Sequence, residues 1–424
     1  MPSNIIIDIS ITHKSSGDKI KIKDTYLQGG YKNDPEAIYR GQKNCIDTTN
    51  KIINKICTDI TSNTTNKNCT DVTNNTTNDS HKNIALLIAE PQSGKTCVIG
   101  RTIEIFIHKA DVLEKYNINV IPRNIYVIIF MSSSSAKKQM QEKLENIFGF
   151  QKENVLHINE LKKLLVIMDK NKEYLFIFDE IHMDLVTNSI VDNFLTEIKK
   201  YKTSSLFISA TPFEHIKFTN VPKIIMKPND GYISIKNLFD KGLIKQAKSL
   251  KDDPSLVKEY LNEIYNDIIT IVKGYVIIRL PQIIDNKKNR TKIMSYVKNW
   301  CAKKEISYDM WLYDQEEKDS INLTLNDEPN CVKFILIKNK LRASESINKK
   351  YIISMHDSNN NMFVHTTAQS LVGRAAGYNA NLKCTIYCDL ENVKEYIKVA
   401  ESNYNILPKK QRSGMFFKSN KFIK

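Results

Sequence analysis

Short apolar runs alternate with amphipathic stretches along most of the chain after residue 83. Runs of mainly aliphatic or aromatic residues predict buried strands, and apolar residues at helical spacing between them predict helices. This alternation is typical of βαβ units around a parallel sheet, so we expect an α/β fold. The predicted strands span 84–89, 125–131, 174–178, 205–208, 274–279, 308–312, 332–337, 351–355 and 383–388. The predicted helices include 136–148, 185–200, 254–273, 288–303 and 392–401.

The polar stretch at residues 226–234 divides these strands into two groups and predicts a domain boundary. Residues 58–81 interrupt the first group: Asn and Thr supply 14 of these 24 residues, and a unit of 12 residues is repeated in tandem. Because each repeat has one aliphatic residue, it cannot bury a face, and we expect an exposed insertion. The predicted organisation is an N-terminal extension (1–35), a first domain (36–226), a second domain (234–403) and a basic C-terminal tail (404–424).

Positive charge dominates, since 62 Lys and Arg stand against 47 Asp and Glu, a formal charge of +15. The excess predicts an anionic partner, nucleic acid first, although a solvated basic surface explains the same total. Eight cysteines without a C-x-x-C pair indicate reduced thiols and not a disulfide framework or zinc site. No apolar run approaches the roughly 18–20 residues that cross a bilayer, so we expect an intracellular, cytoplasmic protein without a membrane partner. The Asn, Lys and Ile bias suggests an A+T-rich genome, as in some large DNA viruses, phages or parasites; if the source is a large DNA virus, a viral factory or virion is the expected location.

A candidate phosphate-binding loop follows the first strand of this series. The sequence Ala-Glu-Pro-Gln-Ser-Gly-Lys-Thr, beginning at residue 89, opens a helical segment, which is the context that such a loop requires. Backbone N–H groups of Gln92, Ser93 and Gly94 are expected to cradle phosphates at the helix N-terminus. Lys95 supplies a charged donor to them, and the Thr96 hydroxyl helps to hold Mg²⁺. A chance Gly-Lys-Thr turn is the alternative interpretation.

Two acidic residues, Asp179 and Glu180, follow the strand predicted at 174–178. They stand at the carboxyl end of a buried strand, where a parallel sheet presents its ligand chemistry. Hydrolysis of Mg-ATP needs one carboxylate for the metal and a second to orient and deprotonate water. We therefore assign Asp179 to Mg²⁺ and Glu180 to the water. A surface Asp-Glu pair after an ordinary strand is the alternative.

A third motif, Ser-Ala-Thr-Pro from Ser209 to Pro212, closes another apolar run. Hydroxyl groups next to the carboxylates of the expected metal site are suited to relaying the state of a nucleotide to neighbouring loops. We assign this coupling to Ser209 and Thr211. The alternative is a hydroxyl cap with a proline that ends the strand.

In this order the three motifs resemble those of the superfamily-two helicases and translocases, in particular the DEAH-type members, over roughly residues 36–400. The resemblance implies two tandem RecA-like domains, which clamp ATP in the cleft between them and move along DNA or RNA. It also implies that Gln42 reads the adenine edge, although a Gln that begins an ordinary helix is nearly as consistent. Ser132, Ser133 and Ser134 resemble the first nucleic-acid contact loop; a helix N-cap is a second interpretation, and both can hold.

In the second half, Gln-Ser-Leu-Val-Gly-Arg-Ala-Ala-Gly-Tyr, beginning at Gln369, resembles the family's sixth motif in its viral and phage branch. The resemblance implies that Gln369 lies at the nucleotide and that Arg374 reaches the γ-phosphate as an arginine finger. Two features depart from the usual motif: three residues separate the Gln from the Gly in place of two, and Gly377 replaces a second arginine.

Other residues complete the expected machinery by the same resemblance. Arg342 lies in a segment similar to the fifth motif and is assigned to nucleic acid, with a solvated basic turn as an equal alternative. His182, after the acidic pair, is expected to couple ATP to the second domain by a hydrogen bond to Gln369 or a neighbour. His356 and Asp357 also end a strand, but without further His or Asp nearby they do not predict a nuclease.

The sequence therefore predicts an enzyme: a helicase or translocase that uses ATP and Mg²⁺ and works on DNA or RNA, held mainly through phosphates. The competing hypothesis is an ATPase motor or switch subunit, without unwinding activity, in a larger restriction, packaging or transcription assembly with protein partners.

Overall fold

A computed structural model describes most of the chain outside the N-terminal third. The described residues are 4–12, 19–27, 47–53, 84–108, 124–130, 134–180, 190–211, 221, 223–281, 286–314, 316–317, 319–338, 340–341, 346–357 and 363–409. They divide into two compact units, one up to Asp230 and the other from Gly231 onward. The Asn/Thr-rich insertion lies outside the described residues, as does the tail after residue 409.

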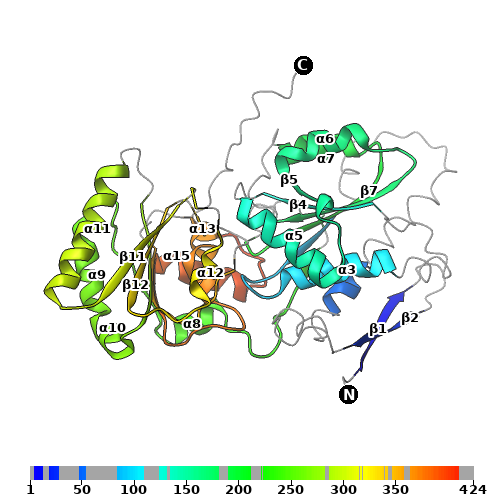
Figure 1. The fold of residues 1–424 in the computed structure, drawn as a ribbon. Coiled ribbons are helices and arrows are strands. Elements are labelled where there is room, and N and C mark those ends of the chain that lie inside the picture. The colour runs from blue at the N-terminus through cyan, green and yellow to red at the C-terminus, as the bar shows by residue number, and fades with distance from the viewer. Residues whose placement is uncertain are drawn as a thin grey trace. The chain divides into compact units, whose positions relative to one another are not determined.

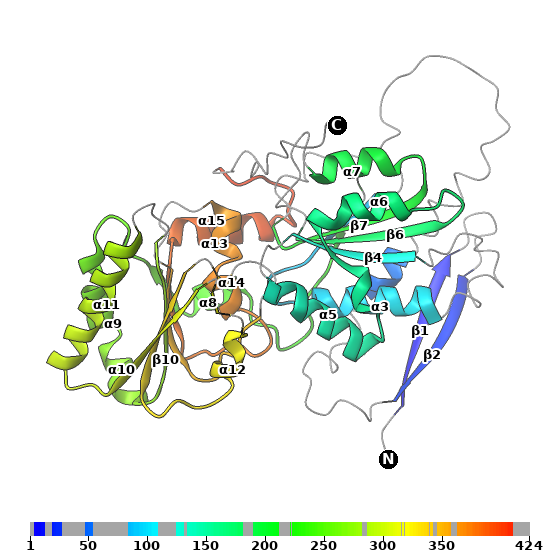
Figure 2. The ribbon, with the colours of Figure 1, turned by 45° about the horizontal axis from the view of Figure 1, so that its top comes forward.

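The first unit is built on a six-stranded sheet with the order β5-β4-β6-β7-β3-β8. All its strand pairs are parallel. Helices cover both faces: α3 and α5 on one, α6 and α7 on the other (Figures 1 and 2). The strands are β3 (Ile84–Ile88), β4 (Asn124–Ile129), β5 (Val155–His157), β6 (Glu173–Asp179), β7 (Lys202–Ser209) and β8 (Lys223–Ile225). The helices are α3 (Lys95–His108), α5 (Ser134–Phe148), α6 (Leu161–Ile167) and α7 (Ile190–Ile198), with two short 3₁₀ turns, η2 (Lys152–Asn154) and η3 (Ile158–Glu160).

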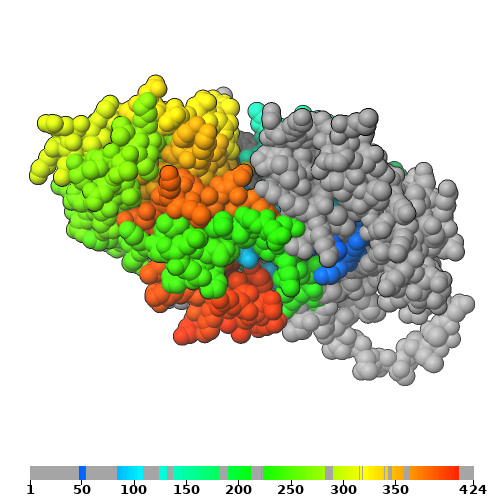
Figure 3. All heavy atoms as spheres, turned by 90° about the horizontal axis from the view of Figure 1, so that it is seen from below, coloured from blue at the N-terminus to red at the C-terminus, as the bar shows by residue number. Residues whose placement is uncertain are grey.

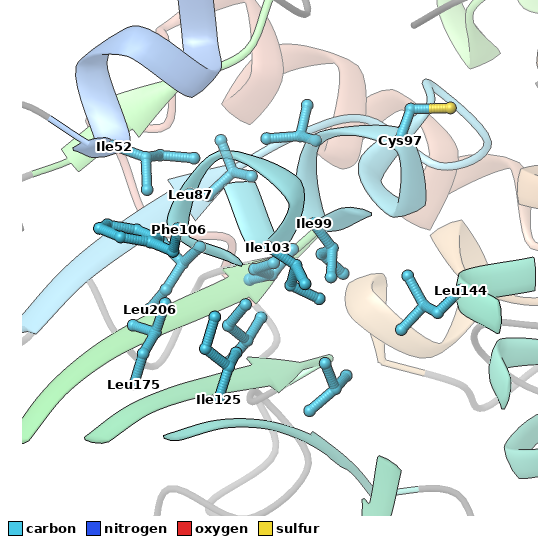
Figure 4. Close-up of a cluster of buried hydrophobic side chains, with 14 of the residues drawn as sticks. Ile52, Leu87, Cys97, Ile99, Ile103, Phe106, Ile125, Leu144, Leu175 and Leu206 are labelled. Atoms are coloured by element: carbon cyan, nitrogen blue, oxygen red, sulfur yellow. The ribbon is translucent and has the colours of Figure 1, made fainter. Parts of the chain in front are cut away.

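The alternation of side chains along β6 explains how one strand serves both faces of this sheet. Leu175 and Ile177 belong to the aliphatic core beneath α3 and α5, which also contains Leu87, Ile103 and Leu144 (Figure 4). The aromatic rings between them point to the opposite face, where Phe176 meets Phe194 of α7 edge to face at 5.1 Å. Successive strand residues face opposite sides of a sheet, so the run reads as continuously apolar when both sides are covered.

The second unit also contains a six-stranded parallel sheet, with the order β11-β12-β10-β13-β14-β9. Helices α9, α10 and α11 contribute to the core on one face of it. The strands are β9 (Ile244–Gln246), β10 (Gly274–Arg279), β11 (Tyr308–Tyr313), β12 (Val332–Ile337), β13 (Ile352–Asp357) and β14 (Thr385–Cys388). The helices are α8 (Ile235–Asp240), α9 (Val257–Glu263), α10 (Tyr265–Ile271), α11 (Asn286–Lys303), α12 (Ile321–Leu325), α13 (Val364–Ala368), α14 (Leu371–Ala375) and α15 (Leu390–Glu401).

The helices α8 and α15 lie side by side at the surface of this unit, α8 green and α15 red in Figure 3. Lys236 of α8 joins them through an ion pair with Glu401 of α15, 3.5 Å between the charged atoms. Because both side chains are about half exposed, this contact accompanies the packing of the two helices and adds little to its stability.

One predicted helix is wrong in its extent. Residues 254–273 do not form one helix but a 3₁₀ turn, η6 (Pro254–Leu256), followed by α9 and α10, which are separated at Ile264. Ile264 is fully buried, and just before it the Asn262 side chain accepts a 2.8 Å hydrogen bond from the Trp300 indole of α11. Tertiary packing therefore overrides the helical periodicity at this point.

The N-terminal extension contains an antiparallel hairpin, β1 (Asn4–Thr12) and β2 (Lys19–Leu27). Residues 47–53 are helical, and Ile52 and Ile53 belong to the core of the first unit. Among the described residues, no helix combines the length and hydropathy that a membrane span requires.

Candidate nucleotide-binding site

The carboxyl ends of three neighbouring strands meet at one edge of the first sheet. In the register of the sheet, Ile88 of β3 is opposite Ser209 of β7, and Ile208 is opposite Asp179 of β6. The N–H of Ala89 donates to the carbonyl of Ser209 at 3.2 Å, which ties the start of the candidate phosphate-binding loop to the end of β7. All three motifs of the first unit therefore open from the same edge.

The segment from Glu90 to Gly94 forms a tight turn directly before α3. The Glu90 carbonyl accepts from the N–H of Ser93 at 3.3 Å and from its hydroxyl at 2.7 Å. Gln92 and Gly94 have φ values of 56° and 98°, so the chain twice enters a region that side chains rarely adopt. Helix α3 then begins at Lys95, with no acidic residue in its first turn. The turn and the positive end of the helix together favour an anion.

Lys95 and Glu180 form an ion pair across this edge of the sheet. The Lys95 ammonium lies 3.0 Å from Glu180 Oε1, and the two side chains are 12% and 4% exposed. Glu180 has a φ of 58°, directly after the end of β6. Asp179, the last residue of β6, is also buried, whereas Thr96 is half-buried in the first turn of α3. A lysine, two carboxylates and a hydroxyl are thus brought together beside the phosphate loop.

Ser209 and Thr211 form a local turn at the end of β7. The Thr211 N–H donates to the Ser209 hydroxyl oxygen at 3.0 Å, and both residues are buried. The hydroxyl pair predicted to couple the nucleotide to other loops is therefore fixed one strand away from Asp179.

Four site residues predicted for the first unit lie outside the described residues: Gln42, Ser132, Ser133 and His182. Ser134 is the first residue of α5. Arg342 also lies outside the described residues, between Leu341 and Ser346 in the second unit.

The proposed arginine finger, Arg374, is buried within the second unit on the short helix α14. Its Nη1 donates to the carbonyls of Gln369 and Ser370, the second at 3.0 Å. Gln369 is buried as well. The guanidinium is therefore held by the backbone at the start of its own helix.

His356 and Asp357, which the sequence left outside the catalytic machinery, are both buried at the end of β13. The His356 ring packs against Tyr260 at 4.6 Å and Tyr387 at 6.0 Å between centroids. Burial lowers the pKa of His356 to about 3, so the ring is neutral. Asp357 forms an ion pair with Arg279, with 3.3 Å between Oδ1 and Nε. Among the described residues, no group of three His, Cys, Asp or Glu is arranged to hold a metal ion.

Comparison with known proteins gives one relative of high coverage. No protein-family model matches the chain. Over 359 residues it is 32% identical to "Uncharacterized protein L594" of Acanthamoeba polyphaga mimivirus, covering 80% of this chain and 88% of the relative. The chain belongs to the family of this mimivirus protein. Among solved structures, a variant of S. cerevisiae Dbp5 bound to RNA and ADP BeF3 aligns with a TM-score of 0.44 and 14% identity, over 76% of this chain and 84% of that one.

In this member of the family, the first sheet places one strand, β7, between β3, which precedes the candidate phosphate-binding loop, and β6, which precedes Glu180. Both sheets are parallel and carry helices on their faces. The predicted α/β fold class, with two tandem units that each contain a parallel sheet flanked by helices, is confirmed. Arg279, a charged residue that ends β10 at the carboxyl edge of the second sheet, was not among the predicted site residues. Its position at a strand end is the signal that would have identified it.

Proposed function

We propose that this protein is a nucleic-acid-dependent ATPase of the DEAH-type helicase and translocase class. The observation that carries the proposal is the pairing of Lys95 with Glu180 beside a phosphate-loop turn at the carboxyl edge of a RecA-like sheet. In this assignment the turn at Gln92, Ser93 and Gly94 binds phosphates, and Lys95 leaves the carboxylate to donate to them.

The side chains near the turn match the chemistry of Mg²⁺. The Thr96 hydroxyl and the Asp179 carboxylate supply hard oxygen donors, the kind that Mg²⁺ prefers together with phosphate oxygens. When bound, the ion neutralises charge on the phosphates. Glu180 orients the attacking water and accepts its proton, which is the role of a general base.

The remaining assignments rest on the resemblance of the motifs. Gln369 contacts the nucleotide, and Arg374 stabilises the charge that develops on the transferred phosphoryl group. Ser209, Thr211 and His182 transmit the state of the nucleotide, and Gln42 reads the base.

Ser132, Ser133, Ser134 and Arg342 are assigned to the phosphate backbone of DNA or RNA. Contacts of this kind position a protein on a polynucleotide without selecting its sequence, and they weaken as salt rises. The net charge of +15 supports such a partner.

The test is the steady-state ATPase rate at low salt, measured for the wild type and Glu180→Gln, alone and with single-stranded DNA, duplex DNA or RNA. The matched control is Glu173→Gln, at the opposite end of the same strand β6. We expect one polymer to stimulate hydrolysis in the wild type and the control and not in Glu180→Gln. Hydrolysis that depends on Glu180 but ignores every polymer would favour the partner-driven ATPase subunit, and hydrolysis unaffected by Glu180→Gln would overturn the proposal.

A second assay separates a helicase from a translocase. A fluorescently labelled duplex with a single-stranded overhang reports strand separation, while displacement of streptavidin from a biotinylated strand reports movement alone. A helicase gives both signals and a translocase only the second.

A further inference from the structure

A chain of polar contacts crosses the carboxyl edge of the second sheet and begins at Arg279, the last residue of β10. Arg279 Nη1 donates to the carbonyl of Lys340, and Nη2 donates to that of Leu341, both at 2.8 Å. These carbonyls belong to the segment that follows β12 and directly precedes Arg342. The planar guanidinium thus fixes the backbone of this segment at two successive positions.

Asp357 continues the chain on the neighbouring strand. In the register of the sheet Asp357 of β13 lies directly opposite Arg279, and Asp357 Oδ1 is 3.3 Å from Arg279 Nε. The carboxylate is 1% exposed. Its other oxygen, Oδ2, accepts a hydrogen bond from the Ser370 hydroxyl.

Ser370 completes the chain because it stands immediately before α14, the helix that carries Arg374. A serine in this position normally caps the helix, but the hydroxyl of Ser370 makes no cap bond and donates to Asp357. Its carbonyl accepts from Arg374 Nη1 at 3.0 Å. A continuous path therefore runs from Leu341 through Arg279, Asp357 and Ser370 to Arg374.

Stability alone does not account for an ion pair in this position. Removing an arginine and an aspartate from water is unfavourable, and apolar residues of similar volume often stabilise a core equally well or better. What the pair provides is a defined geometry: it fixes the segment after β12 and the start of α14 to the same strand end.

We propose that Arg279, Asp357 and Ser370 are positioning residues that couple the segment at residues 340–341 to Arg374. The proposal rests on the proposed function, in which Arg342 contacts nucleic acid and Arg374 acts on the phosphoryl group. Nucleic acid that displaces the segment shifts Arg279, and the Asp357–Ser370 link transmits this shift to the start of α14. Because coupling between two sites is reciprocal, the nucleotide state alters the affinity for nucleic acid through the same contacts.

The most direct test is Ser370→Ala, which removes only the link between Asp357 and α14 and leaves the Arg279 contacts in place. We expect the polynucleotide-stimulated ATPase rate to fall at least about fivefold, the lower end of typical coupling between sites. The dissociation constant for a fluorescent oligonucleotide stays within about twofold. Ser370→Thr keeps a hydroxyl and restores the stimulated rate. A purely structural role would instead lower the melting temperature and both activities together.

A second variant, Asp357→Asn, tests the centre of the path at nearly constant volume. Because contacts in one network are not additive, Asp357→Asn combined with Ser370→Ala should reduce stimulation no more than the stronger single change. The control is Asp309→Asn, which removes the exposed Asp309–Lys333 pair, 3.1 Å long, from the same sheet. This change should leave stimulation unaltered.

The outcomes separate this inference from the function on which it rests. A wild type that no polymer stimulates would contradict the proposed function itself. A stimulated wild type with equally stimulated Ser370→Ala and Asp357→Asn would overturn the coupling path and leave the ATPase assignment intact. Additive losses in the double variant would also contradict the path, because they would show that the two residues act independently.

Discussion

The ammonium of Lys95 lies 3.0 Å from a carboxylate oxygen of Glu180, and both side chains are almost fully buried. Lys95 begins α3, the helix that comes after β3 in the chain, and Glu180 follows β6. In the sheet, β7 lies between β3 and β6. A phosphate group in the turn would compete with Glu180 for the same ammonium. The arrival of nucleotide and the release of the carboxylate are therefore one event in the proposed mechanism.

The pair predicts a measurable coupling in the absence of nucleotide. Lys95→Met leaves Glu180 buried without this counter-charge, and we expect the free energy of unfolding to fall by about 1.5–3 kcal/mol, the range for a charged hydrogen bond. Adding Glu180→Gln to this variant should recover part of the loss. Urea denaturation of the wild type, both single variants and the double variant measures the interaction.

An exposed ion pair provides the control for this cycle. Lys200 and Glu197 are 2.8 Å apart but about half exposed, so Lys200→Met should change stability by no more than about 0.5 kcal/mol. Strictly additive effects at Lys95 and Glu180 would show that the buried contact contributes nothing.

Gly94→Ala should abolish ATP binding because the backbone conformation at this position disfavours a side chain, and not because the new methyl group would clash with a neighbour. A Cβ at Gly94 would meet only Met226 Cε at 3.8 Å, an ordinary contact, but the φ of 98° is unfavourable for any side chain. Gly242→Ala is the matched control, since Gly242 has a φ of 68° and open space around it. Both variants should lose about 1 kcal/mol of stability, whereas only Gly94→Ala should lose affinity for a fluorescent ATP analogue. Equal affinities would exclude a specific role for this turn.

Gly100→Ala tests the packing of α3 on α5. A Cβ at Gly100 would lie 2.0 Å from the Phe148 ring, so the two helices must separate or the ring must move. Overpacking of this kind destabilises by about 1–3 kcal/mol and should outweigh the gain of roughly 1 kcal/mol from replacing glycine in a helix. Adding Phe148→Leu should restore part of the loss in urea denaturation. Unchanged stability of Gly100→Ala would show that the helices have room to shift.

Acid should destabilise the second unit through His356. Its pKa is about 3 in the folded protein because of burial, against 6.5 for an unperturbed histidine. Between these values the unfolded chain binds more protons, so the free energy of unfolding falls as the pH is lowered from about 6.5 towards 3. The slope from this one group is at most about 1.4 kcal/mol per pH unit.

His356→Phe keeps an aromatic ring beside Tyr260 and removes the titration. Urea denaturation at pH 7 and pH 5 should show a smaller loss for this variant than for the wild type, by roughly 2 kcal/mol. Equal losses would mean that His356 is protonated in the folded state or that its segment unfolds separately.

Strand positions and fold class were accessible from the sequence because the pattern that encodes them is local. The runs at 274–279 and 332–337 coincide with β10 and β12. The strands β5, β8 and β9 were missed because three residues each are too few to show a period. The separation of α9 from α10 at Ile264 was missed because contacts near it, such as the hydrogen bond from Trp300 to Asn262, involve residues far away in the chain.

In the candidate site, too, features encoded locally were predicted and contacts between distant residues were not. The motifs placed Lys95, Asp179, Glu180 and Ser209 at strand or helix ends, and the parallel sheet brings such ends together without further information. The sequence could not show that Lys95 pairs with Glu180, because the contact depends on the order of the strands. The pairing of Arg279 with Asp357 depends in the same way on β10 lying next to β13.

The backbone contacts of Arg374 have a consequence for the protein in the absence of nucleotide. Nη1 of Arg374 is bonded to two carbonyls of its own segment in the absence of any substrate. To serve the phosphoryl group it must exchange those bonds for others of at least equal strength, each worth about 1 kcal/mol or more. In the proposed mechanism these backbone bonds would hold Arg374 away from the nucleotide, and hydrolysis would be slow until bound nucleic acid made the exchange favourable.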